Sequence, residues 1–286
     1  MKIGLIINIK RPDVFRVARE VISFLTKNGE HRLVMDMEAA TAMSYEKLGV
    51  DSIEMQRVDL ILAMGGDGTL LHTVRMIEGK SIPILGINLG SLGFLTEVTE
   101  EGLYSALTNI LLGHYQIEKR MMLSIKIIRQ TATLTTFKAL NEAVVAESEI
   151  ARMVNLKVFI DAEYLTTYRA DGLIISTPTG STGYSLAAGG TIVVPRMKVL
   201  MLTPVCPHTL TARPMIIPEN SKIIIEIISS GQSILTIDGQ QTYSLEFADK
   251  IEIERAEEEI CLIKPQQCGF YEVLRNKLKW GGGIMN

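Results

Sequence analysis

The stretch "VDLILAMGGDGTLLHTVRMIEG", Val58–Gly79, carries the clearest fold signal in the chain. A run of aliphatic residues typical of a buried strand ends at Gly65, and apolar residues recur at helical spacing from Leu70 onward. A strand that passes through a glycine turn directly into a helix is typical of an open parallel sheet. Ligands of such sheets bind at the carboxyl ends of the strands, so the segment Gly65–Thr69 is a candidate binding loop.

This loop combines three glycines with one acidic residue. The glycines allow the backbone to approach a ligand closely, and the start of the helix offers unpaired N–H groups to a phosphate. Asp67 would repel a phosphate unless a divalent cation bridges the two or the carboxylate accepts a proton from an attacking hydroxyl. A third interpretation is that Asp67 only caps the helix. Neither a P-loop motif nor a GxGxxG motif after a strand is present.

The N-terminal part of the chain alternates between strand and helix patterns. Predicted strands are "KIGLIINI", "HRLVMDM", "VDLILAM" and "PILGINL", and the segments between and after them include amphipathic helices such as "PDVFRVAREVISFLTKNG" and "EEGLYSALTNILLGHY". The loop "GINLGSLGFLTE", Gly86–Glu97, follows another strand and brings more glycines to the same sheet edge. We therefore predict a Rossmann-like α/β domain with a parallel sheet over residues 1–116.

After Tyr115 the pattern changes to short β-branched runs separated by Gly, Pro, Asn and Ser. These runs are too close together for crossover helices, so they predict an all-β, sandwich-like domain over residues 117–267. The segment "GFYEVLRNKLKW" returns to helical spacing. We predict that residues 268–286 form a C-terminal helix that packs on the N-terminal domain.

Composition limits the classes of function. The 286 residues carry a net charge of −3, which does not favour nucleic acid or an anionic membrane as a partner. Cys206, Cys261 and Cys268 form no CxxC pair, which favours a reducing compartment and no zinc site. The four histidines have no metal-ligand spacing, and the N-terminal apolar run is too short for a signal peptide or a membrane span. We expect a cytoplasmic protein without a metal site built from its own side chains.

The segment "YRADGLIISTPTGSTGYSLAAGG", Tyr168–Gly190, is the second candidate loop. Its "TPTGSTGY" gathers four hydroxyl side chains, two glycines and a tyrosine, which suit phosphate or ribose oxygens and a stacked base. A hydroxyl-rich surface turn is the alternative, although Arg169 and Asp171 supply charges that a plain turn does not need. In "LNEAVV", Asn141 and Glu142 form a polar pair at the start of a strand, which suits ribose hydroxyls.

Several segments in the same order closely resemble the NAD kinase family. They are "GGDGTLLHTVR", "PILGINLGSLGFLTE", "LNEAVV", "YRADGLIISTPTGSTGYSLAAGG", "LTPVCPHTLTARPMIIP" and "DGQ", and they extend from Val58 to Trp280. GGDGT alone is shared with diacylglycerol kinases, sphingosine kinases and phosphofructokinases, whereas the "TPTGSTGYSLAAGG" block is specific. The resemblance implies a Rossmann-like domain, a β domain, NAD bound between them, and a homo-oligomer, either a dimer or a tetramer.

The resemblance also assigns roles to residues. It makes Asp67 the acceptor of the proton from the 2′-hydroxyl of the adenosine ribose, and it places Asn141 and Glu142 at the ribose and adenine end of NAD. Two of the predicted cofactor-binding residues depart from the family: Gly183 stands where many members have alanine, and His72 stands where a basic residue is common. The further residues implied to contact NAD are Gly68, Arg152, Arg169, Asp171, Thr182, Tyr184, Ser185, Leu186, Ala187 and Gln240.

The function implied is transfer of the γ-phosphoryl group of ATP, or of a phosphoryl group of polyphosphate, to NAD with Mg²⁺, which gives NADP. Phosphoryl transfer needs mostly positioning and charge neutralisation, so a divalent ion would supply the positive charge that the loops lack. Two other functions compete with this one. A lipid kinase of the diacylglycerol or sphingosine type would also carry GGDGT, and a non-catalytic dinucleotide sensor would use Asp67 only as a cap. Whether Asp67 accepts the proton, holds the metal, or does both stays open at this point.

Overall fold

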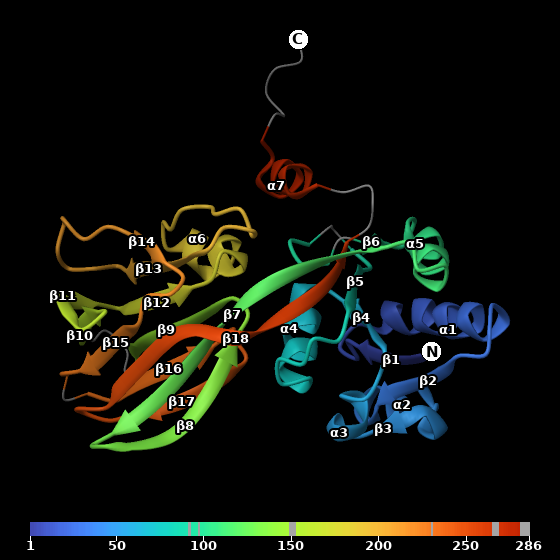
Figure 1. Ribbon diagram of the computed structural model, residues 1–286, viewed down its shortest axis with the longest axis horizontal. Coiled ribbons are helices and arrows are strands. Elements are labelled where there is room, and N and C mark those ends of the chain that lie inside the picture. The colour runs from blue at the N-terminus through green and yellow to red at the C-terminus, as the bar shows by residue number, and fades with distance from the viewer. Residues whose placement is uncertain (91–92, 97, 149–152, 230, 265–268, 281–286) are drawn as a thin grey trace, which may run out of the picture. The chain divides into compact units, whose positions relative to one another are not determined.

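The computed structural model describes residues 1–90, 93–96, 98–148, 153–229, 231–264 and 269–280 (Figure 1). The chain divides into two compact units, which are described separately. Unit 1 comprises Met1–Lys119 and Ile260–Asn286, and unit 2 comprises Arg120–Glu259.

Unit 1 is built on a parallel sheet. Its strands are β1 (Lys2–Ile7), β2 (Arg32–Asp36), β3 (Gly49–Val50), β4 (Leu60–Gly65), β5 (Ile84–Asn88) and β6 (Val98–Thr99). The order β3-β2-β1-β4-β5 is parallel throughout, β6 pairs with β5, and Leu262 near the end of β18 (Lys250–Lys264) pairs with Ile84. The carboxyl ends of β1, β4 and β5 therefore lie side by side, which assembles the loops that follow them at one edge.

Helices of unit 1 pack on this sheet through single apolar faces. In α1, Val14, Val17 and Val21 are buried in the same core cluster as Leu5 of β1 and Leu62 of β4. The helices are α1 (Pro12–Lys27), α2 (Met37–Met43), η1 (Glu46–Leu48), α3 (Ser52–Met55), α4 (Asp67–Met76) and α5 (Leu103–Leu111). The predicted βα unit of the opening stretch is confirmed, since β4 ends at Gly65 and α4 begins at Asp67.

Unit 2 consists of antiparallel strands. One sheet has the order β14-β13-β12-β9-β16-β17, and the strands β11, β10, β15 and β18 are paired in that order, with β7 paired to β18 and β8. The elements are β7 (Gln116–Arg129), β8 (Ala132–Ala139), β9 (Glu142–Glu147), β10 (Val154–Ile160), β11 (Glu163–Ala170), β12 (Gly172–Ser176), η2 (Thr179–Thr182), α6 (Tyr184–Ala187), β13 (Val199–Val205), β14 (Met215–Pro218), β15 (Ile223–Ile227), β16 (Ser233–Ile237) and β17 (Gln241–Leu245).

Alternate residues of both sets of strands fill one core, as in a sandwich. Val145 of β9 and Leu235 of β16 lie in the same buried cluster as Leu156 of β10 and Ile225 of β15. The predicted α/β domain followed by an all-β domain is thus confirmed. The last helix, α7 (Phe270–Leu278), belongs to unit 1, and its packing on the N-terminal domain stays a prediction. Within the described residues, every helix is too short or too polar to cross a membrane.

Candidate active site

The glycines between β4 and α4 have different environments. A Cβ atom on Gly65 would lie 2.9 Å from Thr69 Cβ and 3.0 Å from Asn8 Cβ, so Gly65 is required for packing. A Cβ atom on Gly66 or on Gly68 would meet nothing within 4 Å. The backbone at these two positions is therefore open at the N-terminus of α4, where a helix favours an anion.

Asp67, the first residue of α4, is held by the loop that follows β5. Its Oδ1 accepts hydrogen bonds from the Leu95 N–H at 3.1 Å, the Thr96 N–H at 3.2 Å and Thr96 Oγ1 at 3.0 Å. Its Oδ2 accepts one, from the Phe94 N–H at 3.0 Å. An ionised carboxylate has about four lone-pair directions, so the two oxygens are not equivalent. Among the described donors, Oδ2 is the oxygen that keeps capacity for a ligand.

The same loop approaches Asp67 so closely that it needs a glycine. A Cβ atom on Gly93 would lie 2.9 Å from Asp67 Cγ, and its contact with Asp67 Oδ1 would be closer still. Thr96 is fully buried, and its hydroxyl also accepts a hydrogen bond from Asn88 Nδ2 at 3.1 Å. The predicted meeting of the Gly65–Thr69 and Gly86–Glu97 loops thus occurs in the described part of the second loop.

His72 lies on α4 and is half-buried. Burial is the main cause that lowers the pKa of its imidazole, and the positive charge of Arg75 lowers it further. The nearest described partner is Arg75, whose Nη2 lies 2.9 Å from His72 Nδ1. The lowered pKa favours the neutral imidazole in this structure.

Three loops of unit 2 meet at one edge of the six-stranded sheet. In the pairing register, Glu142 at the start of β9 lies opposite Ser176 at the end of β12, and Ala143 lies opposite Ile237 at the end of β16. The Asn141–Glu142 pair, the hydroxyl-rich loop after β12 and the turn after β16 therefore come together. These segments are about 35 to 100 residues apart in sequence.

The hydroxyl-rich loop is tied to the Asn141 backbone. Thr177 donates its N–H to the carbonyl oxygen of Asn141 at 2.9 Å and its hydroxyl to that of Leu140 at 2.6 Å. A Cβ atom on Gly180 would lie within 2.8 Å of the Asn141 Cα. The buried Arg120 adds a hydrogen bond from its guanidinium to Thr179 Oγ1 at 3.3 Å. This part of the loop is built into the fold rather than being a plain surface turn.

Asn141 and Glu142 present oxygen atoms that the described protein does not satisfy. Asn141 Oδ1 and Glu142 Oε2 are both buried without a hydrogen-bond partner. Glu142 is only 6% exposed, and burial raises the pKa of its carboxyl to about 8, with the neighbouring Asp238 carboxylate adding to the rise. Buried polar atoms without hydrogen-bond partners are costly unless a ligand supplies the partners.

The other residues of this loop differ in exposure. Tyr184 is 48% exposed and Ala187 is exposed, whereas Ser185 is fully buried and shares a 3.0 Å hydrogen bond with Thr203. Thr182, Gly183 and Leu186 are half-buried. A Cβ atom on Gly183 would lie 3.0 Å from Glu142 Oε2, so this glycine faces the unsatisfied oxygen directly.

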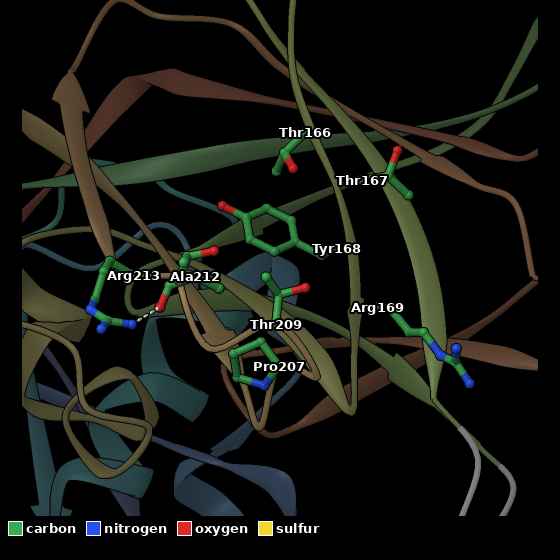
Figure 2. A pocket seen from close by; sticks show the side chains of 9 residues that line it. Thr166, Thr167, Tyr168, Arg169, Pro207, Thr209, Ala212 and Arg213 are labelled. Carbon is green, nitrogen blue, oxygen red and sulfur yellow. Dashed lines mark hydrogen bonds between the residues drawn. The ribbon is translucent and has the colours of Figure 1, made fainter.

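Arg169 and Asp171 are exposed at the end of β11. A cavity of about 220 Å³ adjoins this strand and is lined by Tyr168, Arg169, Thr209 and Arg213, among others. Figure 2 shows the guanidinium groups of Arg169 and Arg213 on opposite sides of the Tyr168 ring. Arg213 donates from Nη1 to the carbonyl oxygens of Leu210 and Ala212, so the backbone holds one end of its guanidinium. The predicted Arg152 lies outside the described residues.

One residue of the second site was not among the predicted ones. Asp238 accepts hydrogen bonds from the N–H groups of Leu140, Asn141 and Glu142, at 2.9, 2.7 and 3.1 Å. The predicted Gln240 is exposed at the same turn, two residues further on. The motif "DGQ" was the available signal, but it drew attention to the glutamine.

Comparison with known proteins identifies the family of this chain. The ATP-NAD kinase N-terminal domain matches residues 3–115, and the ATP-NAD kinase C-terminal domain matches residues 140–265. The NAD kinase of Geobacter metallireducens is 44% identical over 98% of this chain and 99% of its own length. The chain belongs to the NAD kinase family. An NAD kinase of Moorella thermoacetica is 45% identical over 98% of this chain and 90% of its own length.

Solved structures of two related kinases have the same fold as this chain. The crystal structure of yeast NADH kinase complexed with NADH has a TM-score of 0.90 and 26% identity, and it covers 100% of this chain and 89% of its own. An NAD kinase from Archaeoglobus fulgidus in complex with ATP has a TM-score of 0.75 and 24% identity, over 99% and 98% of the chains. The family assignment favours phosphorylation of NAD over the lipid kinase and sensor alternatives.

Proposed function

We propose that the chain transfers the γ-phosphoryl group of ATP, or a phosphoryl group of polyphosphate, to the 2′-hydroxyl of the adenosine ribose of NAD and so forms NADP. The observation that carries this proposal is the hydrogen bonding of the Asp67 carboxylate. Its carboxylate is oriented by four donors at the mouth of an open glycine loop, with capacity left on one oxygen. A residue that served only as a helix cap would not need donors from another loop.

Unit 1 supplies the groups for the phosphoryl donor. The open backbone at Gly66 and Gly68 allows phosphate oxygens to approach the first N–H groups of α4. His72 offers one further hydrogen-bonding group in this helix. Because these groups carry little positive charge, the transferred phosphoryl group needs charge neutralisation from elsewhere.

A magnesium ion fits this requirement. The phosphate oxygens of the donor would hold the ion, and Asp67 Oδ2, the carboxylate oxygen with remaining capacity, is left for the acceptor. When bound, Mg²⁺ supplies the charge that stabilises the transferred phosphoryl group. With the 93–96 loop in place, Oδ2 has room for one further partner. We assign that position during turnover to the 2′-hydroxyl, whose proton Asp67 accepts.

Unit 2 supplies the groups for NAD. Asn141 Oδ1 needs a hydrogen-bond donor, and the Glu142 carboxyl, protonated below its pKa of about 8, needs a partner; ribose hydroxyls both donate and accept, and the exocyclic amine of adenine donates. Half-exposed Tyr184 would cover the base, and Thr182, Gly183, Leu186 and Ala187 would border it. Ser185 acts indirectly, through the hydrogen bond that holds α6 to Thr203. Gly68 would contribute from the GGDGT loop, and Gln240 from the turn after β16.

The remaining proposals concern assembly and location. Exposed Arg169 and Asp171, together with Arg152, would contact the dinucleotide, and in a homo-oligomer, a dimer or a tetramer, they would serve the NAD of a neighbouring copy. We propose that the enzyme works in the cytoplasm, since its free Cys206 and Cys261 suit a reducing compartment.

A direct assay tests the function. Purified chain is incubated with Mg²⁺, with ATP or polyphosphate as donor, and with NAD, NADH or diacylglycerol as acceptor. We expect a product that carries a phosphate on the 2′ position of the adenosine ribose, identified by mass spectrometry and by an NADP-specific dehydrogenase. Phosphorylation of diacylglycerol, or binding of NAD without turnover by any donor, would overturn the proposal.

A further inference from the structure

We propose that Asp238 is a positioning residue of the dinucleotide site, whose carboxylate fixes the backbone from which Asn141 and Glu142 reach the ligand. This inference rests on the proposed function of that pair. It goes beyond it by assigning a role to a side chain that contacts neither the donor nor the reacting hydroxyl.

The hydrogen bonds of Asp238 are the first argument. Its Oδ1 accepts from the Asn141 N–H at 2.7 Å and from the Glu142 N–H at 3.1 Å, and its Oδ2 accepts from the Leu140 N–H at 2.9 Å. Three successive N–H groups at the start of β9 are thus bound to one carboxylate. The direction in which Asn141 and Glu142 leave the backbone depends on this contact.

The conformation of the turn is the second argument. Asp238 has φ of 49° and Gly239 has φ of 63°, as both central residues of a type I′ turn require. The Gln240 N–H closes the turn on the Ile237 carbonyl oxygen at 2.9 Å. Asparagine and glycine are as suitable as aspartate for this backbone. The turn alone therefore does not explain why an acid stands at this position.

The electrostatic cost is the third argument. Glu142 is buried and Asp238 is half-buried beside it, and the charge on Asp238 contributes to the raised pKa of Glu142. Ser176 of β12 and Gly183 of the loop also face Glu142, and neither titrates. A second carboxylate beside Glu142 is unfavourable unless its hydrogen bonds to the backbone are needed. The three N–H groups of Leu140, Asn141 and Glu142 need such an acceptor, which explains the acid at position 238.

Two variants separate the carboxylate from the turn. Asp238→Asn keeps the shape of the side chain but removes its charge, and one oxygen that accepts from an N–H group becomes an amide nitrogen, which donates. Asp238→Gly keeps the turn but removes all three hydrogen bonds of the carboxylate. Asp249→Asn is the matched control, because Asp249 is a fully buried acid of unit 2 that binds Arg129 and the Glu246 N–H, outside the six-stranded sheet. It should lower stability without changing the dinucleotide site.

The readouts are KM and kcat for NAD, and the pH dependence of the Kd for NAD measured by calorimetry. We expect Asp238→Asn and Asp238→Gly to raise KM by about tenfold or more while kcat changes by less than about threefold, since ground-state and transition-state binding are lost equally. Loss of the Asp238 charge should also lower the pKa of Glu142, so the midpoint of the pH profile of Kd should move to lower pH. Asp249→Asn should keep the wild-type KM and the wild-type midpoint.

A wild-type KM and midpoint in both folded Asp238 variants would overturn the inference. The same rise of KM in Asp249→Asn would also overturn it, because the effect would then be one of general stability. A wild-type protein that neither binds nor phosphorylates NAD would instead refute the proposed function. Failure of the inference about Asp238 can therefore be distinguished from failure of the proposed function.

Discussion

Asp67→Asn is the substitution that tests the chemistry most directly. The two side chains have the same shape, and the amide oxygen will take the Oδ1 position, where three donors converge. The amide nitrogen then faces the Phe94 N–H, so the hydrogen bond from Phe94 to Oδ2 is lost. A hydrogen bond to a charged group contributes about 1.5–3 kcal/mol, which is the expected loss in the free energy of unfolding.

The loss of turnover should be much larger than this structural loss. An amide nitrogen cannot accept the proton of the 2′-hydroxyl, and general base catalysis contributes about 10²–10⁴-fold. We therefore expect kcat to fall about 100-fold or more, while the Kd for NAD changes by less than about threefold.

Thr96→Val is the matched control for the structural effect. It removes the hydroxyl that donates to Asp67 Oδ1 and that accepts from Asn88, within a fully buried site. The free energy of unfolding should fall by about 1–3 kcal/mol, comparable to the loss in Asp67→Asn. Because Oδ2 and its Phe94 donor are untouched, kcat should stay within about threefold of wild type.

The assay pairs urea unfolding with single-turnover kinetics on the same preparations. Single turnover isolates the chemical step from product release. A kcat for Asp67→Asn within about threefold of wild type would refute Asp67 as the proton acceptor. An equal loss of turnover in Thr96→Val would show that Asp67 matters only because it orders the 93–96 loop.

Further predictions concern the glycines and the buried acid. Gly68→Ala should keep the wild-type unfolding midpoint but raise KM for the phosphoryl donor by about tenfold, because its methyl group enters open space beside the helix start. Gly65→Ala should instead lower the unfolding midpoint, since its Cβ meets Thr69 and Asn8. The folded-state pKa of Glu142, about 8, lies above its unfolded value, so the folded state binds more protons between about pH 5 and 8 and stability falls as pH rises through that range. In urea unfolding at several pH values, Glu142→Gln should remove up to about 1.4 kcal/mol per pH unit of that slope.

The main architecture was predictable because its signals are local and strong. The aliphatic run before Gly65 and the helical spacing after it predict β4 and α4, and the change to short β-branched runs predicts unit 2. The segment between β2 and β4 was not predicted in this detail. It contains α2, η1, β3 and α3, which are two to seven residues long and too short for a periodic pattern. Tertiary burial of Met43 and Met55 stabilises them instead.

The candidate site was predictable only where side chains carry the chemistry. Asp67, Asn141 and Glu142 stand out in the sequence because polar residues interrupt apolar runs at strand ends. The N–H groups of Phe94, Leu95 and Thr96 do not stand out, because a backbone donor has no sequence signature. Asp238 was overlooked for a related reason. Its partners are backbone atoms about 100 residues away, and an Asp-Gly pair is common in hairpin turns.

The two units use the same contact for different purposes. In each, one aspartate accepts three successive backbone N–H groups, from Phe94, Leu95 and Thr96 at Asp67 and from the start of β9 at Asp238. At Asp67, a fourth donor, the Thr96 hydroxyl, binds Oδ1 and leaves Oδ2 with a single partner. The backbone there orients a carboxylate that itself takes part in the reaction. At Asp238, the half-buried carboxylate binds three N–H groups, so it orients a backbone from which the Asn141 and Glu142 side chains act. The contrast has a measurable consequence: asparagine at position 67 should lower kcat, whereas asparagine at position 238 should raise KM for NAD.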